Sequence, residues 1–142
     1  MNKTFSIIFF LAFQLSALAG PKWKVILFND SLYLELENTR LKLRPIGPKV
    51  KFIKSEITKY KFKGNPIHLL HYHAGSAGTS KIFTQQRAIL YIPKMRISMG
   101  DFPTKIKSGK DQYVTQPIWK WTKSKLTIVD PTVGKPNIIN LN

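Results

Sequence analysis

The sequence predicts an all-β protein, an antiparallel sandwich or small barrel of about 8–10 short strands. Apolar and polar residues alternate with a period of two along most of the chain after residue 20, and no longer stretch keeps the period of a helix. Proline and glycine interrupt the alternating runs, as turns do in all-β domains. The chain has 142 residues, and we expect one β domain over residues 20–142.

The clearest pattern lies in residues 22–44, which predict three strands joined by turns at 29–30 and 38–39. In that register the leucines share one face and the charged residues the other, and a slip of one residue would expose the leucines. Thr39 disfavours positive φ, so a four-residue loop with the same register is the alternative for the second turn. The expected pairs are Trp23 with Leu36, Val25 with Leu34, Leu27 with Leu32, Leu36 with Leu41 and Leu34 with Leu43, with Glu35 between Lys24 and Lys42 and Glu37 between Lys22 and Arg40.

Residues 49–63 predict a second hairpin, with a three-residue loop at 54–56. It pairs Val50 with Tyr60, but it also opposes lysines directly, which costs roughly 0.2–1 kcal/mol per pair. A short helix is the alternative, although Pro48 and the β-branched residues favour strands.

The remaining elements follow from the same alternation and its interruptions. A final hairpin with its loop at Lys123-Ser124 sets Trp121 opposite Leu126. We expect further strands over 67–73, 81–92 (ended by Pro93) and 94–99, turns at 65–66, 100–103 and 108–111, a flexible loop over 74–80, and an extended C-terminal tail over 130–142.

The N-terminus resembles a secretory signal peptide over residues 1–19. Lys3 supplies a positive charge, residues 5–13 form a short apolar run, and Ala17-Leu18-Ala19 gives the small-x-small pattern of a cleavage site. We therefore expect an exported protein, periplasmic or extracellular. An uncleaved anchor is the alternative, but the apolar run is shorter than the roughly 20 residues that span a bilayer.

The charge is strongly positive, with 23 basic and 7 acidic residues and a net charge of +16. Residues 45–125 hold 16 of the basic and 3 of the acidic residues. Such an excess favours an anionic polymer or a membrane surface as partner, with diffuse attraction because lysines dominate. A solvated face that serves solubility, or coding bias, would leave the same pattern. The expected anion-binding residues are Lys49, Lys51, Lys59, Lys61 and Lys63, with Lys105 and Lys107 as neighbours.

His71 and His73 are the one pair with metal-ligand spacing, because residues two apart on a strand share a face. A metal site would need a third ligand from elsewhere in the chain. Solvated or hydrogen-bonded histidines are the alternative. The candidates for the third ligand are Asp101, Asp111, Met95 and Met99.

Several functional classes lack their motifs. The chain has no cysteine, so it has no disulfides, no Cys-based zinc site and no thiol nucleophile. The run GSAGTSK lacks the Gly-Lys-Ser/Thr order of a phosphate-binding loop, and no Gly-x-Ser-x-Gly elbow occurs. We expect no nucleotide or other cofactor, and the residues favour binding over catalysis, with a metal-dependent enzyme using His71 and His73 left open. The predicted function is binding of an anionic envelope component or a partner protein; a metal-dependent role and a structural subunit that pairs strand edges are the alternatives.

Overall fold

The computed structural model describes residues 22–78, 82–109, 113–131 and 133–142. The expected signal segment at residues 1–19 lies outside them. Over the described residues the all-β prediction is confirmed, because they form strands and connecting turns without a helix. No described segment could therefore cross a bilayer as an apolar helix. The strands are β1 (Lys24–Phe28), β2 (Ser31–Leu36), β3 (Thr39–Lys42), β4 (Lys51–Phe62), β5 (Asn65–Ala77), β6 (Phe83–Ile92), β7 (Ile97–Ser108), β8 (Tyr113–Thr115), β9 (Ile118–Trp121), β10 (Lys125–Val129) and β11 (Pro136–Asn140).

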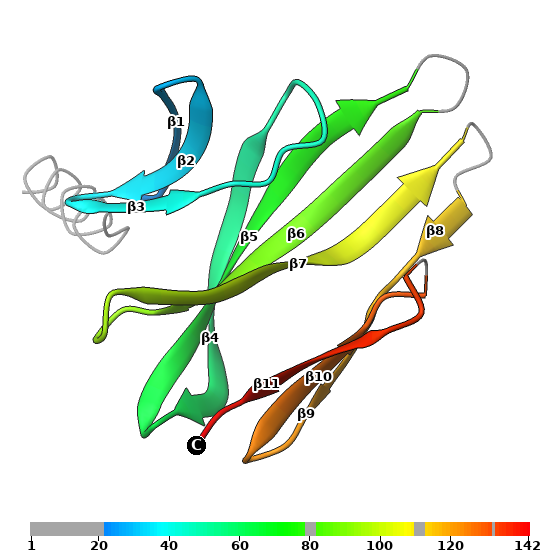
Figure 1. Cartoon of the computed structure of the whole chain (residues 1–142). Coiled ribbons are helices and arrows are strands. Elements are labelled where there is room, and N and C mark those ends of the chain that lie inside the picture. Colours follow the sequence, from blue (N-terminus) through cyan, green and yellow to red (C-terminus); the bar gives the residue numbers. More distant parts are fainter. Residues whose placement is uncertain (1–21, 79–81, 110–112, 132) are drawn as a thin grey trace, which may run out of the picture.

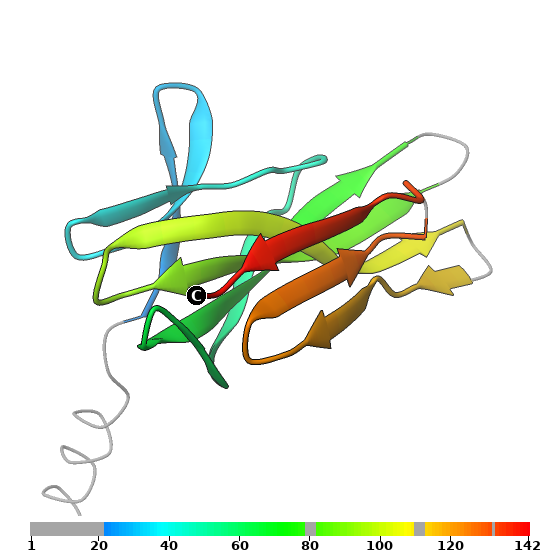
Figure 2. The same cartoon turned by 60° about the horizontal axis from the view of Figure 1, so that its bottom comes forward.

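The strands form three antiparallel sheets, and none of these sheets closes into a barrel. The largest has the order β4-β5-β6-β7-β8, and the two smaller ones have the orders β1-β2-β3 and β11-β10-β9. The smaller sheets lie on opposite sides of the five-stranded sheet (Figures 1 and 2). Two separate apolar cores result, one on each face of the central sheet.

The alternation of side chains along β5 and β6 assigns residues to these two cores. Leu70, Tyr72, Ile89 and Tyr91 point to the first face, where β1–β3 cover them. The neighbouring positions point to the second face, towards β9–β11. The residues buried in that second core are Ile67, Leu69, Leu90, Ile92, Leu126, Ile128 and Leu141.

The first hairpin, β1–β2, has the predicted turn and register. Val25 lies opposite Leu34 and Leu27 opposite Leu32. The turn residues Asn29 and Asp30 have φ of 46° and 60°, the left-handed conformation that tight hairpin turns require and that these residue types tolerate.

The predicted register between β2 and β3 is wrong by two residues. The turn lies at Glu37-Asn38, so Leu36 faces Thr39 and Leu34 faces Leu41. Glu35 consequently pairs with Arg40, whose Nε donates to Oε2 at 2.6 Å, in place of Lys42. A shift of two residues keeps every side chain on its face, so the alternation that predicted the strands could not detect it.

The predicted hairpin at 49–63 is wrong, and so is the helical alternative. Residues 51–62 form the single long strand β4, which pairs with β5 through a turn at Lys63-Gly64. Both turn residues have positive φ, 47° and 79°. Of the lysines that the hairpin would have opposed, Lys51 pairs with His73 and Lys61 with Pro66, so neither faces another lysine.

The predicted turn at 100–103 is also wrong, because these residues lie inside β7. Gly100 and Pro103 mark irregularities in the pairing of β7 with β6. Pro103 is tolerated because β8 pairs only with residues 106–108, which leaves β7 as an edge strand at that position. Of the expected loop at 74–80, residues 74–77 belong to β5 and residues 79–80 lie outside the described residues.

The final hairpin is confirmed. Trp121 lies opposite Leu126 and Trp119 opposite Ile128. Within the expected tail at 130–142, residues 136–140 form β11, which pairs with β10. This added strand brings Leu141 into the second core.

The loop between β3 and β4 packs against the end of β5, backbone to backbone. The amide of Ile46 donates to the carbonyl of Ala74 at 2.8 Å. A Cβ added at Gly75, which has φ of 97°, would lie 2.3 Å from the carbonyl oxygen of Gly47. Only glycine fits this approach, which fixes the entry of the chain into β4.

A buried ionic network ties β7 to β5 and β6 on the first face. Arg87 Nε donates to Asp101 Oδ1 at 2.7 Å, and the Tyr72 hydroxyl donates to Asp101 Oδ2 at 2.5 Å. Burial, followed by the bond to Asp101, raises the pKa of Tyr72 well above its usual value. The amide of Arg44 donates to the Tyr72 hydroxyl at 3.0 Å, which links the network to the end of β3.

The packing at Gly75 predicts a large loss of stability for Gly75→Ala. Gly64→Ala is the matched control, because Gly64 also has positive φ but has open space around its Cβ position. We expect Gly64→Ala to lose about 1–2 kcal/mol and Gly75→Ala to lose about 1–3 kcal/mol more, measured by urea unfolding. Equal losses would show that the close approach to Gly47 contributes nothing.

The buried network predicts that Asp101→Ala lowers the free energy of unfolding by about 3–5 kcal/mol, because Arg87 is left unpaired in the core. The control is Glu35→Ala, which breaks the exposed pair with Arg40 and should cost about 0–1 kcal/mol. Thermal and urea unfolding of both variants measure the difference. Similar losses would contradict the role given to burial.

Candidate anion-binding surface

The second face of the central sheet changes from apolar to polar along β5. Ile67 and Leu69 lie in the core beneath β9–β11, and the next two residues on the same face are His71 and His73. Both histidines are only partly buried. The prediction that they share a face is confirmed by their partners on β6, Ala88 and Gln86, which also lie on that face.

A row of four polar residues crosses four adjacent strands at His73. Lys51 of β4 pairs with His73, His73 pairs with Gln86, and Gln86 pairs with Lys105 of β7. Three strand spacings separate the backbones of the two lysines, roughly 14 Å. In the next row Thr84 pairs with Lys107 on the same face. The sheet therefore brings together lysines that are more than 50 residues apart in the sequence.

Two adjacent hollows lie along this row and share His73 and Gln86. One, of about 480 Å³, is lined on the β4 side by Lys49, Lys51 and Ile53. The other, of about 220 Å³, is lined on the β7 side by Lys105 and Lys107. No described residue that lines either hollow is acidic. We call this area, with its four lysines, His73, Gln86 and Thr84, the lysine surface.

His73 has a defined hydrogen-bonding role. Its Nδ1 accepts from the amide of Gly75 at 3.1 Å, so in the neutral ring the proton is on Nε2. A neutral His73 can therefore donate through Nε2 to an anion. His71 differs, because its Nε2 lies 3.1 Å from Oε2 of Glu56 on β4.

The structure places the predicted metal ligands apart. Asp101 lies on the opposite face, engaged by Arg87 and Tyr72. Met99 packs on the second core, Met95 lies in the β6–β7 turn, and Asp111 falls outside the described residues. Among the described residues no three His, Asp or Glu side chains are grouped to hold a metal.

The predicted lysine face is only partly assembled. Lys51 pairs with His73 on the second face, whereas Lys61 pairs with Pro66, whose alternation assigns it to the first face. The reason is the register shift in β4 between Phe52 and Lys54, where one extra residue reverses the faces of the residues that follow. Lys59 and Lys63 lie with Lys61 at the far end of β4, away from the lysine surface.

Gln86 and Thr84 were not found from the sequence. Both lie in the alternating stretch 81–92, which predicted a strand but not its neighbours. Only the pairing of β5 with β6 places them beside His73 and Ser76, where Ser76 Oγ and Thr84 Oγ1 lie 3.1 Å apart.

Comparisons of the chain with protein-family models, with curated proteins and with solved structures find no match.

The environment of His71 predicts a loss of stability in acid. Burial is the main cause that lowers the pKa of His71 below its ordinary 6.5, while Glu56 acts in the opposite direction. The unfolded chain then binds more protons than the folded protein, so stability falls as the pH drops through about 6.5. Burial lowers the pKa of His68 as well.

We expect the free energy of unfolding to decrease between pH 7.5 and pH 5.5, and His71→Gln to reduce that decrease. Glu56→Gln should lower the pKa of His71 further and make the protein more acid-sensitive, because the raising contribution is gone. Urea unfolding across the pH range and NMR titration of the imidazoles provide the measurements. A decrease that is unchanged in His71→Gln would refute this assignment.

Proposed function

We propose that this chain is an exported, non-enzymatic β protein that binds an anionic envelope component through the lysine surface. The observation that carries the proposal is the row Lys51–His73–Gln86–Lys105 with Lys49 and Lys107 beside it. Export is inferred from the sequence of residues 1–19.

The spread of the lysines favours a ligand with several negative charges. Their backbones lie on strands roughly 14 Å apart, so an extended anion can contact both sides at once, whereas a single small anion would engage one side. Lysines attract anions without demanding a fixed geometry, which suits a flexible polymer or a charged lipid surface. Glycolipid, acidic polysaccharide and anionic lipid all have this chemistry.

The neutral groups between the lysines support the same assignment. The Nε2 proton of His73, the amide of Gln86 and the hydroxyl of Thr84 can donate hydrogen bonds to sulfate, carboxylate or phosphate oxygens. Hydrogen-bond donors that lie between two lines of lysines suit a polymer ligand in which hydroxyl and acidic groups alternate.

The test is binding to heparin and to vesicles that contain phosphatidylglycerol, over a range of salt concentrations. The test variant replaces Lys49, Lys51, Lys105 and Lys107 by Gln. The control replaces four other exposed lysines by Gln and so removes the same charge. They are Lys59, Lys61, Lys63 and Lys123.

We expect the test variant to lose at least about tenfold in affinity at low salt and to reduce the slope of log K against log salt by about 2–4. The control should change both much less. Equal effects of the two variants would show that net charge, and not the lysine surface, drives binding, and no binding at low salt would exclude the function.

A further inference from the structure

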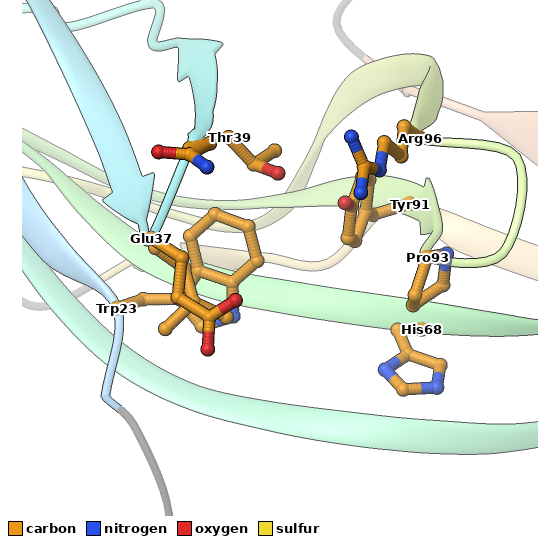
Figure 3. Close-up of a pocket in the computed structure, with 9 residues that line it drawn as sticks. Trp23, Glu37, Thr39, His68, Tyr91, Pro93 and Arg96 are labelled. Atoms are coloured by element: carbon orange, nitrogen blue, oxygen red, sulfur yellow. The ribbon is translucent and has the colours of Figure 1, made fainter.

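A second cleft lies on the opposite, first face of the central sheet, at the edge of β1–β3 (Figure 3). It has a volume of about 360 Å³, within the range of small-molecule sites. Its lining comes from the start of β1, the β2–β3 turn, β5, and the end of β6 with the turn that follows. The lining residues are Trp23, Leu36, Glu37, Asn38, Thr39, His68, Tyr91, Pro93 and Arg96.

Two aromatic rings form the floor of this cleft. Trp23 and Tyr91 contact each other edge to face, with ring centroids 5.5 Å apart and ring planes at 87°. They are 9% and 5% exposed, so packing holds both rings in place. Both rings line the cleft, and the face of an aromatic ring, best of all an indole, attracts a quaternary ammonium group.

Opposite charges stand at the rim. Glu37 lies on the same side of the opening as Trp23, and Arg96 lies on the side of Tyr91 (Figure 3). Both side chains are exposed, and no ion pair within the described part of the chain includes either one. His68, whose pKa is lowered by burial, also lines the cleft, on the side of Pro93 (Figure 3).

The backbone at both charged residues is strained. Glu37 has φ of 52° and Arg96 has φ of 54°, although neither residue type favours the left-handed region. Glycine would be the better residue at either turn position. Glu37 and Arg96 therefore place side chains of opposite charge on two separate turns around one cleft.

We propose that this cleft binds a small zwitterion that carries a quaternary ammonium group and an anionic group. The ammonium group lies over Trp23 beside the carboxylate of Glu37, and the anionic group pairs with the guanidinium of Arg96. Betaines and phosphocholine headgroups share this chemistry. The site is independent of the lysine surface, which lies on the other face of the sheet.

Isothermal titration of the protein with phosphocholine and with glycine betaine tests the proposal, with choline and inorganic phosphate as half-ligands. We expect dissociation constants for the zwitterions of about 1 mM or tighter, and at least about tenfold weaker binding of each half-ligand. Chemical shift changes should include the Trp23 indole. No binding of either zwitterion, or equal binding of choline alone, would overturn the proposal.

Arg96→Gly and Glu37→Gly separate ligand binding from folding. Each removes a charged group and also relieves the positive φ, so we expect unfolding temperatures no lower than that of the unmodified protein. Each variant should weaken zwitterion binding at least about tenfold, which corresponds to the loss of one charged partner. Lys94→Gln, in the same turn as Arg96, is the charge-matched control and should bind normally. Unchanged binding in Arg96→Gly would refute the site.

Vesicles of phosphatidylcholine distinguish the two sources of this chemistry. If free phosphocholine binds and the vesicles also bind, with both lost in Arg96→Gly, the natural ligand is a lipid headgroup. If free phosphocholine binds and the vesicles do not, the ligand is a dissolved zwitterion. Both results support the site, and vesicle binding that survives Arg96→Gly without binding of the free zwitterions would contradict it.

Discussion

The structure depends on one constraint, namely that the two central strands β5 and β6 carry apolar side chains on both faces. Leu70 and Ile89 point one way, while Leu69 and Leu90 point the other. A sheet with two apolar faces is stable in water only when both are covered. Here the chain before the sheet covers one face and the chain after it covers the other (Figure 1).

The two smaller sheets cover the central sheet only as far as its apolar residues extend. On the second face, apolar residues of β5 end at Leu69, and beyond them the chain has His71 and His73 with lysines on the flanking strands. The part of the sheet that β9–β11 leave uncovered therefore becomes the lysine surface. On the first face, the β2–β3 turn reaches only the edge of the apolar area, and the gap beside Tyr91 becomes the cleft. Both candidate sites lie where a core ends.

Local pairing could be predicted from the sequence, but long-range pairing could not. The β1–β2 and β9–β10 hairpins are encoded by short turns and by side chains that match across the strands, such as Trp121 with Leu126. The β2–β3 register differs by two residues because alternation has a period of two and cannot distinguish such shifts. Residues 49–63 were expected to form their own hairpin, whereas the turn lies at their end, at Lys63-Gly64, and β4 pairs with β5. Four of the seven predicted lysines lie at the lysine surface, and the other three lie at the far end of β4 and in the turn that follows it.

The alternation of β5 also keeps the two proposed sites apart. His68 lines the cleft and His73 lines the lysine surface, and because five residues separate them, an odd number, they point to opposite faces. A polyanion that neutralises the lysines of one face leaves Arg96 and Glu37 accessible on the other. Binding at one site therefore does not block the other by contact.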